Sequence, residues 1–377
     1  MGGLRQDLRY ALRNLGRSPG FATTVLATLA LASGAVVAIF SVAHAVLLKP
    51  LPYRDPDRLV RIGHVQGEAS KRPGSSFSPQ DFEDLEADHS GLDGVAAYSY
   101  FPNLSGKNLT GAGEPDRIVE AEVSGSFFSL LGAPALEGRT LEPPDDRLGS
   151  NQEVVLSYGL WHRRFSADRS IVGRTVQLDG KPYTVVGVMP PPFALPAAEV
   201  EAWVPLSTVT DDDVPHQRGI RWISVLGRLS PGADAAAVRA RLDTLFSRLA
   251  SKYPESNTGF HRALVVPLSE AVVGDVRPAI LVLFGAVCLV LLIAATNVAN
   301  LLLARASVRE REVAIRSALG APRSRIVRQF LTESLVLALA GGALGLLLAS
   351  WGVDALVSLA SAYVPRAAEI GIDTGVL

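Results

Sequence analysis

Three long stretches without charged residues dominate the pattern of hydrophobic and polar positions. The first runs from Phe21 to Leu48, with His44 as its one titratable side chain. The second lies between Arg277 and Arg305, and the third between Glu333 and Asp354. Each is close to or longer than the roughly 20 residues that a helix needs to cross a hydrocarbon core. We therefore expect three transmembrane helices, at 21–48, 278–304 and 331–360.

The first stretch has an alternative interpretation as a cleaved signal peptide, because Ala43-His44-Ala45 resembles a cleavage site. A signal peptide, however, has an apolar core of only about 7–15 residues. The stretch here is 28 residues long, so its length favours a retained transmembrane helix.

Residues 1–20 have the pattern of a basic amphipathic helix. Four arginines follow one another at a spacing of four residues, and four leucines form a neighbouring stripe: Arg5, Arg9, Arg13 and Arg17, then Leu4, Leu8, Leu12 and Leu15. Such a helix suits an anionic membrane surface, so membrane lipid is an expected partner. A nucleic-acid-binding arm is the alternative, but the transmembrane stretch that follows argues against it.

Charge predicts which side of the membrane each segment occupies. The segment from Arg305 to Gln329 holds seven Arg and two Glu, and the N-terminal segment is also basic. Basic loops remain in the cytoplasm, so both segments are expected inside. The segment 49–277 is then extracytoplasmic, 305–330 is a cytoplasmic loop, and 361–377 begins an outer loop.

The segment 49–277 alternates between strand and helix patterns. Strands are expected at 58–66, 117–123, 153–157, 175–178, 183–188, 222–229 and 263–268, and helices at 78–88, 126–131, 158–165 and 231–253. Asp179-Gly180 between two strands is a strong hairpin signal. Ser78 is expected to cap the first of the helices, with Pro79 in its first turn. The mixture predicts an α+β domain built as two lobes.

Composition adds three constraints. The chain of 377 residues is 48% hydrophobic and 19% charged, with a net charge of −1, so its overall charge does not favour nucleic acid. Cys288 is the sole cysteine and lies in the second transmembrane stretch, which excludes an intramolecular disulfide. The segment 49–277 must therefore be stabilised by its own hydrophobic core, for which it is long enough.

The cytoplasmic segment has helical order of its own. Ser307–Leu319 lacks Pro and Gly, and Glu312 and Arg316 form a favourable pair four residues apart. Gly320 stands where a left-handed helix cap is needed, and Pro322 fits the first turn of the next helix. Periodicity alone leaves two interpretations open, a solvated basic loop or a rigid helix that docks a cytosolic partner.

The run REREVAIRSALGAPR at Arg309–Arg323, followed by Gln329, Phe330, Leu331 and Glu333, resembles the cytoplasmic signature of FtsX/MacB-like ABC-transporter permeases. In that family the segment is a coupling helix that rests on the ATPase. The resemblance implies this role for the following residues: Arg309, Glu310, Arg311, Glu312, Val313, Ala314, Ile315, Arg316, Leu319, Gly320 and Ala321.

Four further runs resemble the same family. LSYGLW at Leu156–Trp161, IVGR at Ile171–Arg174 and YTVVGVMP at Tyr183–Pro190 resemble a MacB-type periplasmic core domain. The N-terminal run LRYALRNLGRSPGF resembles the duplicated permease branch of acidobacterial type. Such permeases have at least four transmembrane helices, and the duplicated branch has a second exported domain. We therefore expect this chain to correspond to the N-terminal part, with a fourth helix missing.

Small and amide residues within the apolar stretches suggest helix packing. Ala30, Gly34 and Ala38 recur every four residues, and Gly341 and Gly345 form a GxxxG pattern that favours a packing or dimer face. Asn297 and Asn300 lie three residues apart near the cytoplasmic end of the second stretch. Amides in such positions usually hydrogen-bond to a neighbouring helix, so a packing role is favoured over substrate binding.

Signatures of catalysis are missing from the sequence. Gly106-Lys107 is followed by Asn and Gly180-Lys181 by Pro, so neither matches a phosphate-binding loop. The six histidines show no zinc-ligand spacing, and the run Asp211–Asp213 has the character of a solvated loop. We expect no catalytic residue, no metal and no cofactor bound by this chain.

The resemblance implies the permease subunit of an ABC transporter in a bacterial inner membrane, working in export or efflux. It also implies a separate cytosolic ATPase that binds ATP and Mg, a second permease copy, and an extracytoplasmic adaptor or outer-membrane partner. Two alternatives remain, a non-transporting scaffold that activates an outer partner and a membrane-anchored extracytoplasmic enzyme. The sequence specifies no substrate.

Overall fold

The computed structural model divides the chain into two compact units. The helical unit comprises Met1–Lys49 and Asp275–Leu377, and the α+β domain comprises Pro50–Gly274. The structure describes residues 13, 18–65, 77–88, 90–102, 104–111, 114–147, 149–150, 152–191, 193–209, 217–274, 276–308, 315, 323–360 and 370–371.

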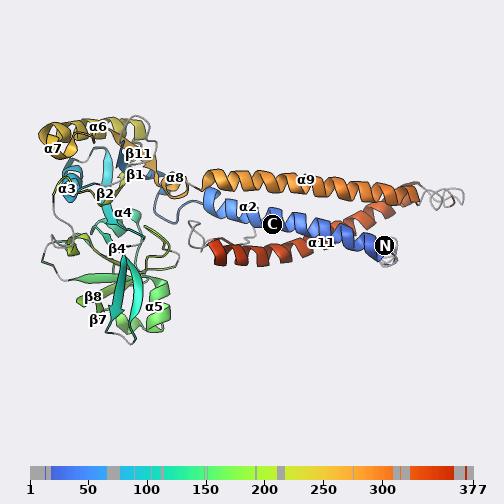
Figure 1. Ribbon diagram of the computed structural model, residues 1–377, viewed down its shortest axis with the longest axis horizontal. Helices are drawn as coiled ribbons and strands as arrows, with labels where there is room; N and C mark the ends of the chain where they lie inside the picture. Colours follow the sequence, from blue (N-terminus) through green and yellow to red (C-terminus); the bar gives the residue numbers. More distant parts are fainter. Residues whose placement is uncertain are drawn as a thin grey trace. The chain divides into compact units, whose positions relative to one another are not determined.

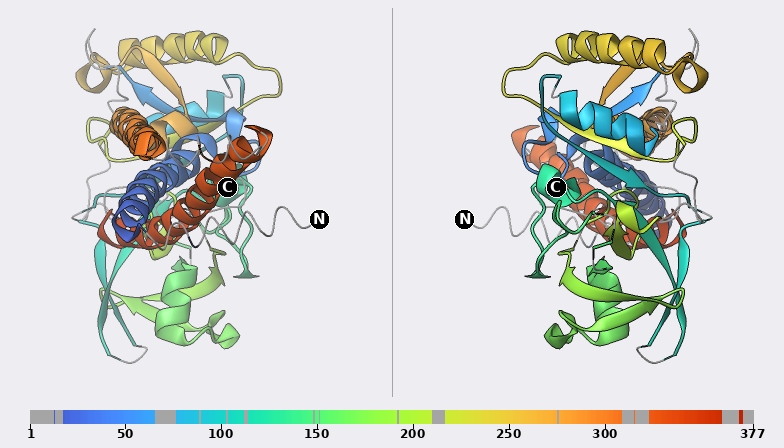
Figure 2. Two further views of the ribbon diagram at one scale, coloured as in Figure 1. Left: turned by 90° about the vertical axis from the view of Figure 1, so that its right-hand side faces the viewer. Right: turned by 90° about the vertical axis from the view of Figure 1, so that its left-hand side faces the viewer.

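Three long helices form the described part of the helical unit (Figure 1): α2 at Pro19–Ala43, which continues as a π-helical turn η1 at His44–Leu48, α9 at Arg277–Val308, and α11 at Arg323–Ala360. All three are long and apolar enough to cross a membrane. The helices extend beyond the expected limits of 278–304 and 331–360 at their cytoplasmic ends, because charged residues such as Arg323 and Arg325 continue the helix. α2 packs against both α9 and α11 (Figure 2).

The α+β domain contains one continuous sheet with eleven strands among the described residues. The strands are β1 Leu59–His64, β2 Leu92–Ser99, β3 Gly106–Thr110, β4 Asp116–Val123, β5 Glu137–Gly138, β6 Glu153–Leu156, β7 Thr175–Leu178, β8 Lys181–Val188, β9 Ala202–Pro205, β10 Ser224–Leu229 and β11 Ala263–Pro267. The helices are α3 Pro79–Asp88, α4 Phe127–Leu131, α5 Tyr158–Phe165, α6 Ala235–Lys252, α7 Pro254–Asn257 and α8 Leu268–Val273, with short 3₁₀ turns η2 Pro56–Arg58, η3 Arg169–Ile171 and η4 Leu206–Thr208.

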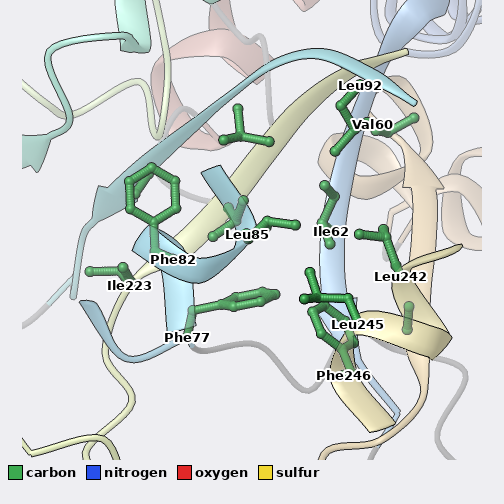
Figure 3. Close-up of a cluster of buried hydrophobic side chains, with 14 of the residues drawn as sticks. Val60, Ile62, Phe77, Phe82, Leu85, Leu92, Ile223, Leu242, Leu245 and Phe246 are labelled. Atoms are coloured by element: carbon green, nitrogen blue, oxygen red, sulfur yellow. The ribbon is translucent and has the colours of Figure 1, made fainter. Parts of the chain in front are cut away.

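One part of this sheet, which we call the α/β lobe, has the antiparallel strand order β11-β1-β10-β2. Helix α3 connects β1 to β2, and α6 connects β10 to β11, which is the arrangement of a split βαβ fold. The two helices cover one face of the sheet (Figure 3): Leu85 from α3 and Leu242 and Phe246 from α6 pack toward Ile62 of β1.

The remaining strands, which we call the barrel lobe, are inserted between β2 and β10. Strand pairings run β4-β3-β7-β8-β6-β9 and return from β9 to β4, so six strands close on themselves. Alternate residues of these strands point into an apolar core that α5 helps to fill with Leu160 and Trp161. The expectation of two lobes is therefore confirmed.

Local signals located several elements correctly. Asp179 and Gly180 both adopt positive φ, 48° and 78°, in the turn between β7 and β8. The Ser78 hydroxyl accepts a hydrogen bond from the Asp81 amide at the start of α3. The expectations missed strands β2, β3, β5 and β9 and the short helices α7 and α8. The acidic run 211–213 lies outside the described residues.

Candidate functional site in the helical unit

Helices α2 and α11 approach each other closely at their glycines. A Cβ atom built on Gly34 would lie 2.9 Å from the carbonyl oxygen of Gly345. A Cβ on Gly345 would overlap the Ser33 hydroxyl and lie 3.0 Å from the Ala30 carbonyl oxygen. These distances are shorter than ordinary van der Waals contacts, so the two backbones lie close together at the glycines, with the Ser33 hydroxyl beside them.

Neighbouring small residues extend this contact along both helices. A Cβ on Gly341 would lie 2.7 Å from the Leu29 Cβ. One turn beyond the glycine pair, Ala38 belongs to a buried cluster with Ala349 and Val353. The structure thus brings the small residues Ala30, Gly34 and Ala38 of α2 together with Gly341 and Gly345 of α11, a pairing that the sequence did not indicate.

Asn297 and Asn300 are placed differently. Both side chains are exposed on α9 of the single chain. The packing role expected for these amides therefore stays a prediction. The apolar surface of α9 is also largely exposed, including Leu283, Leu289 and Ile293.

A contact that the sequence analysis missed fastens α9 to the N-terminal end of α2. The guanidinium of Arg305 donates a hydrogen bond to the Ser18 Oγ at 2.8 Å. The same guanidinium lies over the Phe21 ring, 4.3 Å from its centroid. In the sequence, Arg305 is only one of the positive charges of the cytoplasmic loop, because no local pattern specifies Ser18 or Phe21 as its partner.

The residues expected to form the coupling helix, Arg309–Ala321, lie outside the described residues, with one exception. Ile315 is helical and its side chain is exposed. The described helix α11 begins directly after this segment, at Arg323.

Comparison with protein families now identifies the chain. Residues 22–245 match the MacB-like periplasmic core domain, and residues 284–370 match the FtsX-like permease C-terminal domain. The chain belongs to the MacB/FtsX-like permease family. It is a multi-pass inner-membrane protein, and its α+β domain is extracytoplasmic.

Individual relatives cover parts of the chain. The macrolide export ATP-binding/permease protein MacB of Hahella chejuensis is 28% identical over 63% of this chain and 35% of its own length. The protein of the same name from Salmonella paratyphi A is 28% identical over 70% of this chain and 42% of its own length. This chain thus spans less than half the length of these curated relatives.

Among solved structures, the periplasmic region of MacB from Actinobacillus actinomycetemcomitans covers 58% of this chain and 92% of its own, with 18% identity and a TM-score of 0.43.

Proposed function

We propose that this chain is the permease component of an ABC transporter and relays ATP-driven motion across the membrane to its α+β domain, in export or efflux. A cytosolic ATPase outside these 377 residues would bind ATP and Mg and hydrolyse the nucleotide. The segment Arg309–Ala321 would be its docking site, and a second copy of the permease would complete the assembly.

The observation that carries this proposal is the backbone contact between Gly34 and Gly345. Helix α11 begins beside the proposed docking segment, at Arg323, and packs against α2. Helix α2 leads through η1 into the α+β domain at Pro50. Because the glycines bring the two helix backbones close together, a displacement of α11 is expected to move α2 with it and so to reach the domain.

Helix α9 supplies a second connection. It leaves the α+β domain after Gly274 and runs without interruption to Val308, at the edge of the docking segment. Its exposed apolar surface supports contact with lipid and with the second permease copy. Both routes start in the cytoplasm and end in the domain, which supports mechanical relay rather than catalysis by this chain.

The test is ATP turnover by the complex of this permease with the ATPase that co-purifies with it, reconstituted in lipid. Glu312→Lys replaces an attractive pair with Arg316 by a repulsive one, at a cost of only about 0.2–0.5 kcal/mol within a helix. Gly320→Val places a β-branched residue where a left-handed cap is expected. Both variants should insert normally and lose stimulation of ATP turnover.

Asp212→Lys, in the extracytoplasmic acidic run, is the control and should leave stimulation unchanged. Normal stimulation by both docking-segment variants would refute the docking role. Stimulated ATP turnover that activates an outer partner without any export would instead support the scaffold alternative.

A further inference from the structure

A pocket of ≈ 380 Å³ lies within the α+β domain, between its two lobes. The barrel lobe contributes Lys107, Glu120 and Asp179 to its lining, and the segment that leads into β10 contributes Trp222. Phe101 and Leu104 form an apolar part of the wall and are 42% and 78% exposed, so the pocket is accessible from solvent. Its volume lies within the range of small-molecule sites, about 300–1,000 Å³.

Glu120 is the unusual residue in this pocket. It lies on β4, shares a face with Ile118 of the barrel core, and is only 3% exposed. Its Oε1 lies 3.3 Å from the Lys107 ammonium, whereas its Oε2 is buried without a hydrogen-bond partner among the described residues. A buried carboxylate oxygen that lacks a donor is costly, so such an atom points to a group that the protein alone does not supply.

The neighbouring charges leave Glu120 only half compensated. The Lys107 ammonium also lies 3.8 Å from the Asp179 carboxylate, so it is shared between two acids. Glu122 and Lys181 line the same pocket. With three carboxylates and two ammonium groups, the site favours one further positive charge.

A divalent metal ion is disfavoured as the source of that charge. The Lys107 ammonium already occupies the position between Glu120 and Asp179, where it would repel a metal. Within the described ranges, no three His, Cys, Asp or Glu side chains are grouped as metal ligands. An ammonium group is compatible with the site, because it needs one carboxylate oxygen and can use an aromatic wall for the rest of the molecule.

We propose that this pocket binds a small amphipathic amine, whose ammonium group donates to Glu120 Oε2 and whose apolar part packs against Phe101, Leu104 and Trp222. The site belongs to the α+β domain alone and does not depend on ATP coupling. Burial raises the pKa of Glu120 to about 7 against the attraction of Lys107, and Glu122 and Asp179 add to the increase. Deprotonation of the Glu120 carboxyl near neutral pH would therefore allow the amine to bind.

The test is calorimetric titration of the full chain in lipid nanodiscs with tryptamine, an aromatic alkylamine. We expect saturable binding of tryptamine at about pH 8, where Glu120 is ionised and an alkylamine is still protonated. N-acetyltryptamine has the same ring without the charge and should bind at least about tenfold more weakly, the factor for the loss of one charged hydrogen bond. Indole-3-propionate, which is an anion, should not bind.

Two substitutions separate the charged from the apolar contact. Glu120→Gln keeps the side-chain volume and should weaken tryptamine about tenfold or more without affecting N-acetyltryptamine. Phe101→Ala should weaken both ligands equally. Asp116→Asn is the matched control, because Asp116 begins the same strand but lies outside the pocket lining.

The pH dependence gives an independent readout. Tryptamine affinity should rise from about pH 6 to about pH 8 in the native chain and stay flat in Glu120→Gln, whose thermal unfolding verifies that it is folded. Absence of saturable tryptamine binding would overturn the proposal, as would unchanged affinity in Glu120→Gln or equal binding of the acetylated ligand.

Discussion

Replacing Gly345 by Ala should disrupt the contact between α2 and α11 more than a glycine-to-alanine change elsewhere on α11. The added Cβ would overlap the Ser33 hydroxyl and lie 3.0 Å from the Ala30 carbonyl oxygen and 3.1 Å from the Gly34 amide nitrogen. Ser33 can rotate, although it would then give up its 2.7 Å hydrogen bond to the Leu29 carbonyl. The two backbone atoms can move only if the helices separate.

The expected cost follows from these contacts. Overpacking in a well-packed interior costs about 1–3 kcal/mol. Ala is a better helix former than Gly by up to about 1 kcal/mol, which offsets part of the loss. We therefore expect Gly345→Ala to lower the free energy of unfolding of the helical unit by about 1–2 kcal/mol.

Gly342→Ala is the matched control. Gly342 lies on the same helix, and a Cβ there would meet no atom within 4 Å. It should be neutral or slightly stabilising, because only the helix-propensity gain applies. The assay is unfolding in mixed micelles of a mild detergent and SDS, followed by circular dichroism of the helices.

The double variant Ser33→Ala/Gly345→Ala identifies the cause. If the hydroxyl were the whole obstacle, the double variant would regain full stability. We expect partial recovery, because the Ala30 and Gly34 backbone atoms remain. Equal stability of Gly345→Ala and Gly342→Ala would refute the tight packing of α2 on α11.

Three further predictions concern charged and titratable groups. Arg305→Gln should lower the stability of the helical unit by about 2 kcal/mol, because it loses the hydrogen bond to Ser18 and the cation–π contact with Phe21; mixed-micelle unfolding identical to that of the native chain would contradict this. Burial, reinforced by Arg221 and opposed by Asp81, lowers the pKa of His64 from 6.5 to about 3. As the pH falls, the unfolded chain therefore binds a proton at His64 before the folded chain does. The free energy of unfolding should be unaffected by His64 above pH 6.5 and should decrease by at most about 5 kcal/mol toward pH 3, as followed by tryptophan fluorescence. The same pH slope in His64→Phe would exclude His64 as the cause. The pH dependence of stability that Glu120 causes has the opposite sign to that of His64. The pKa of Glu120 in the folded chain is about 7, above the usual 4.5, so ionisation of Glu120 destabilises the fold as the pH rises from 4.5 to about 7. At about pH 8, Glu120→Gln should therefore have a free energy of unfolding up to about 3 kcal/mol higher than the native chain, measured by denaturant titration. This difference should shrink toward pH 4.5.

Features with a local cause could be predicted from the sequence. The three transmembrane helices follow from apolar length alone, and the hairpin between β7 and β8 follows from Asp179-Gly180, whose backbone needs positive φ. Helix α6 follows from an apolar stripe that ends up buried, with Leu242 and Leu249 in the core. In each case neighbouring residues decide the conformation.

Features with a distant cause could not be predicted. Strand β9, Ala202–Pro205, is buried on both faces and therefore lacks alternation, and its partners β4 and β6 lie far away in the sequence. The cost of burying Glu120 depends on groups of other strands and turns, among them Lys107 and Asp179, so it is not visible in the strand pattern of β4. The glycines of α2 and α11 had the composition of a packing face, but nothing in either helix specified the other as partner.

Hydrogen–deuterium exchange of the permease–ATPase complex in nanodiscs tests the proposed relay most directly, by comparing a vanadate-trapped ATP state with the ADP state. We predict that trapping changes exchange at η1, at α8 and within the α+β domain of the native complex. The change in the domain should be lost in Gly345→Ala and retained in Gly342→Ala. An α+β domain whose exchange is identical in both nucleotide states, while ATP turnover continues, would contradict the account.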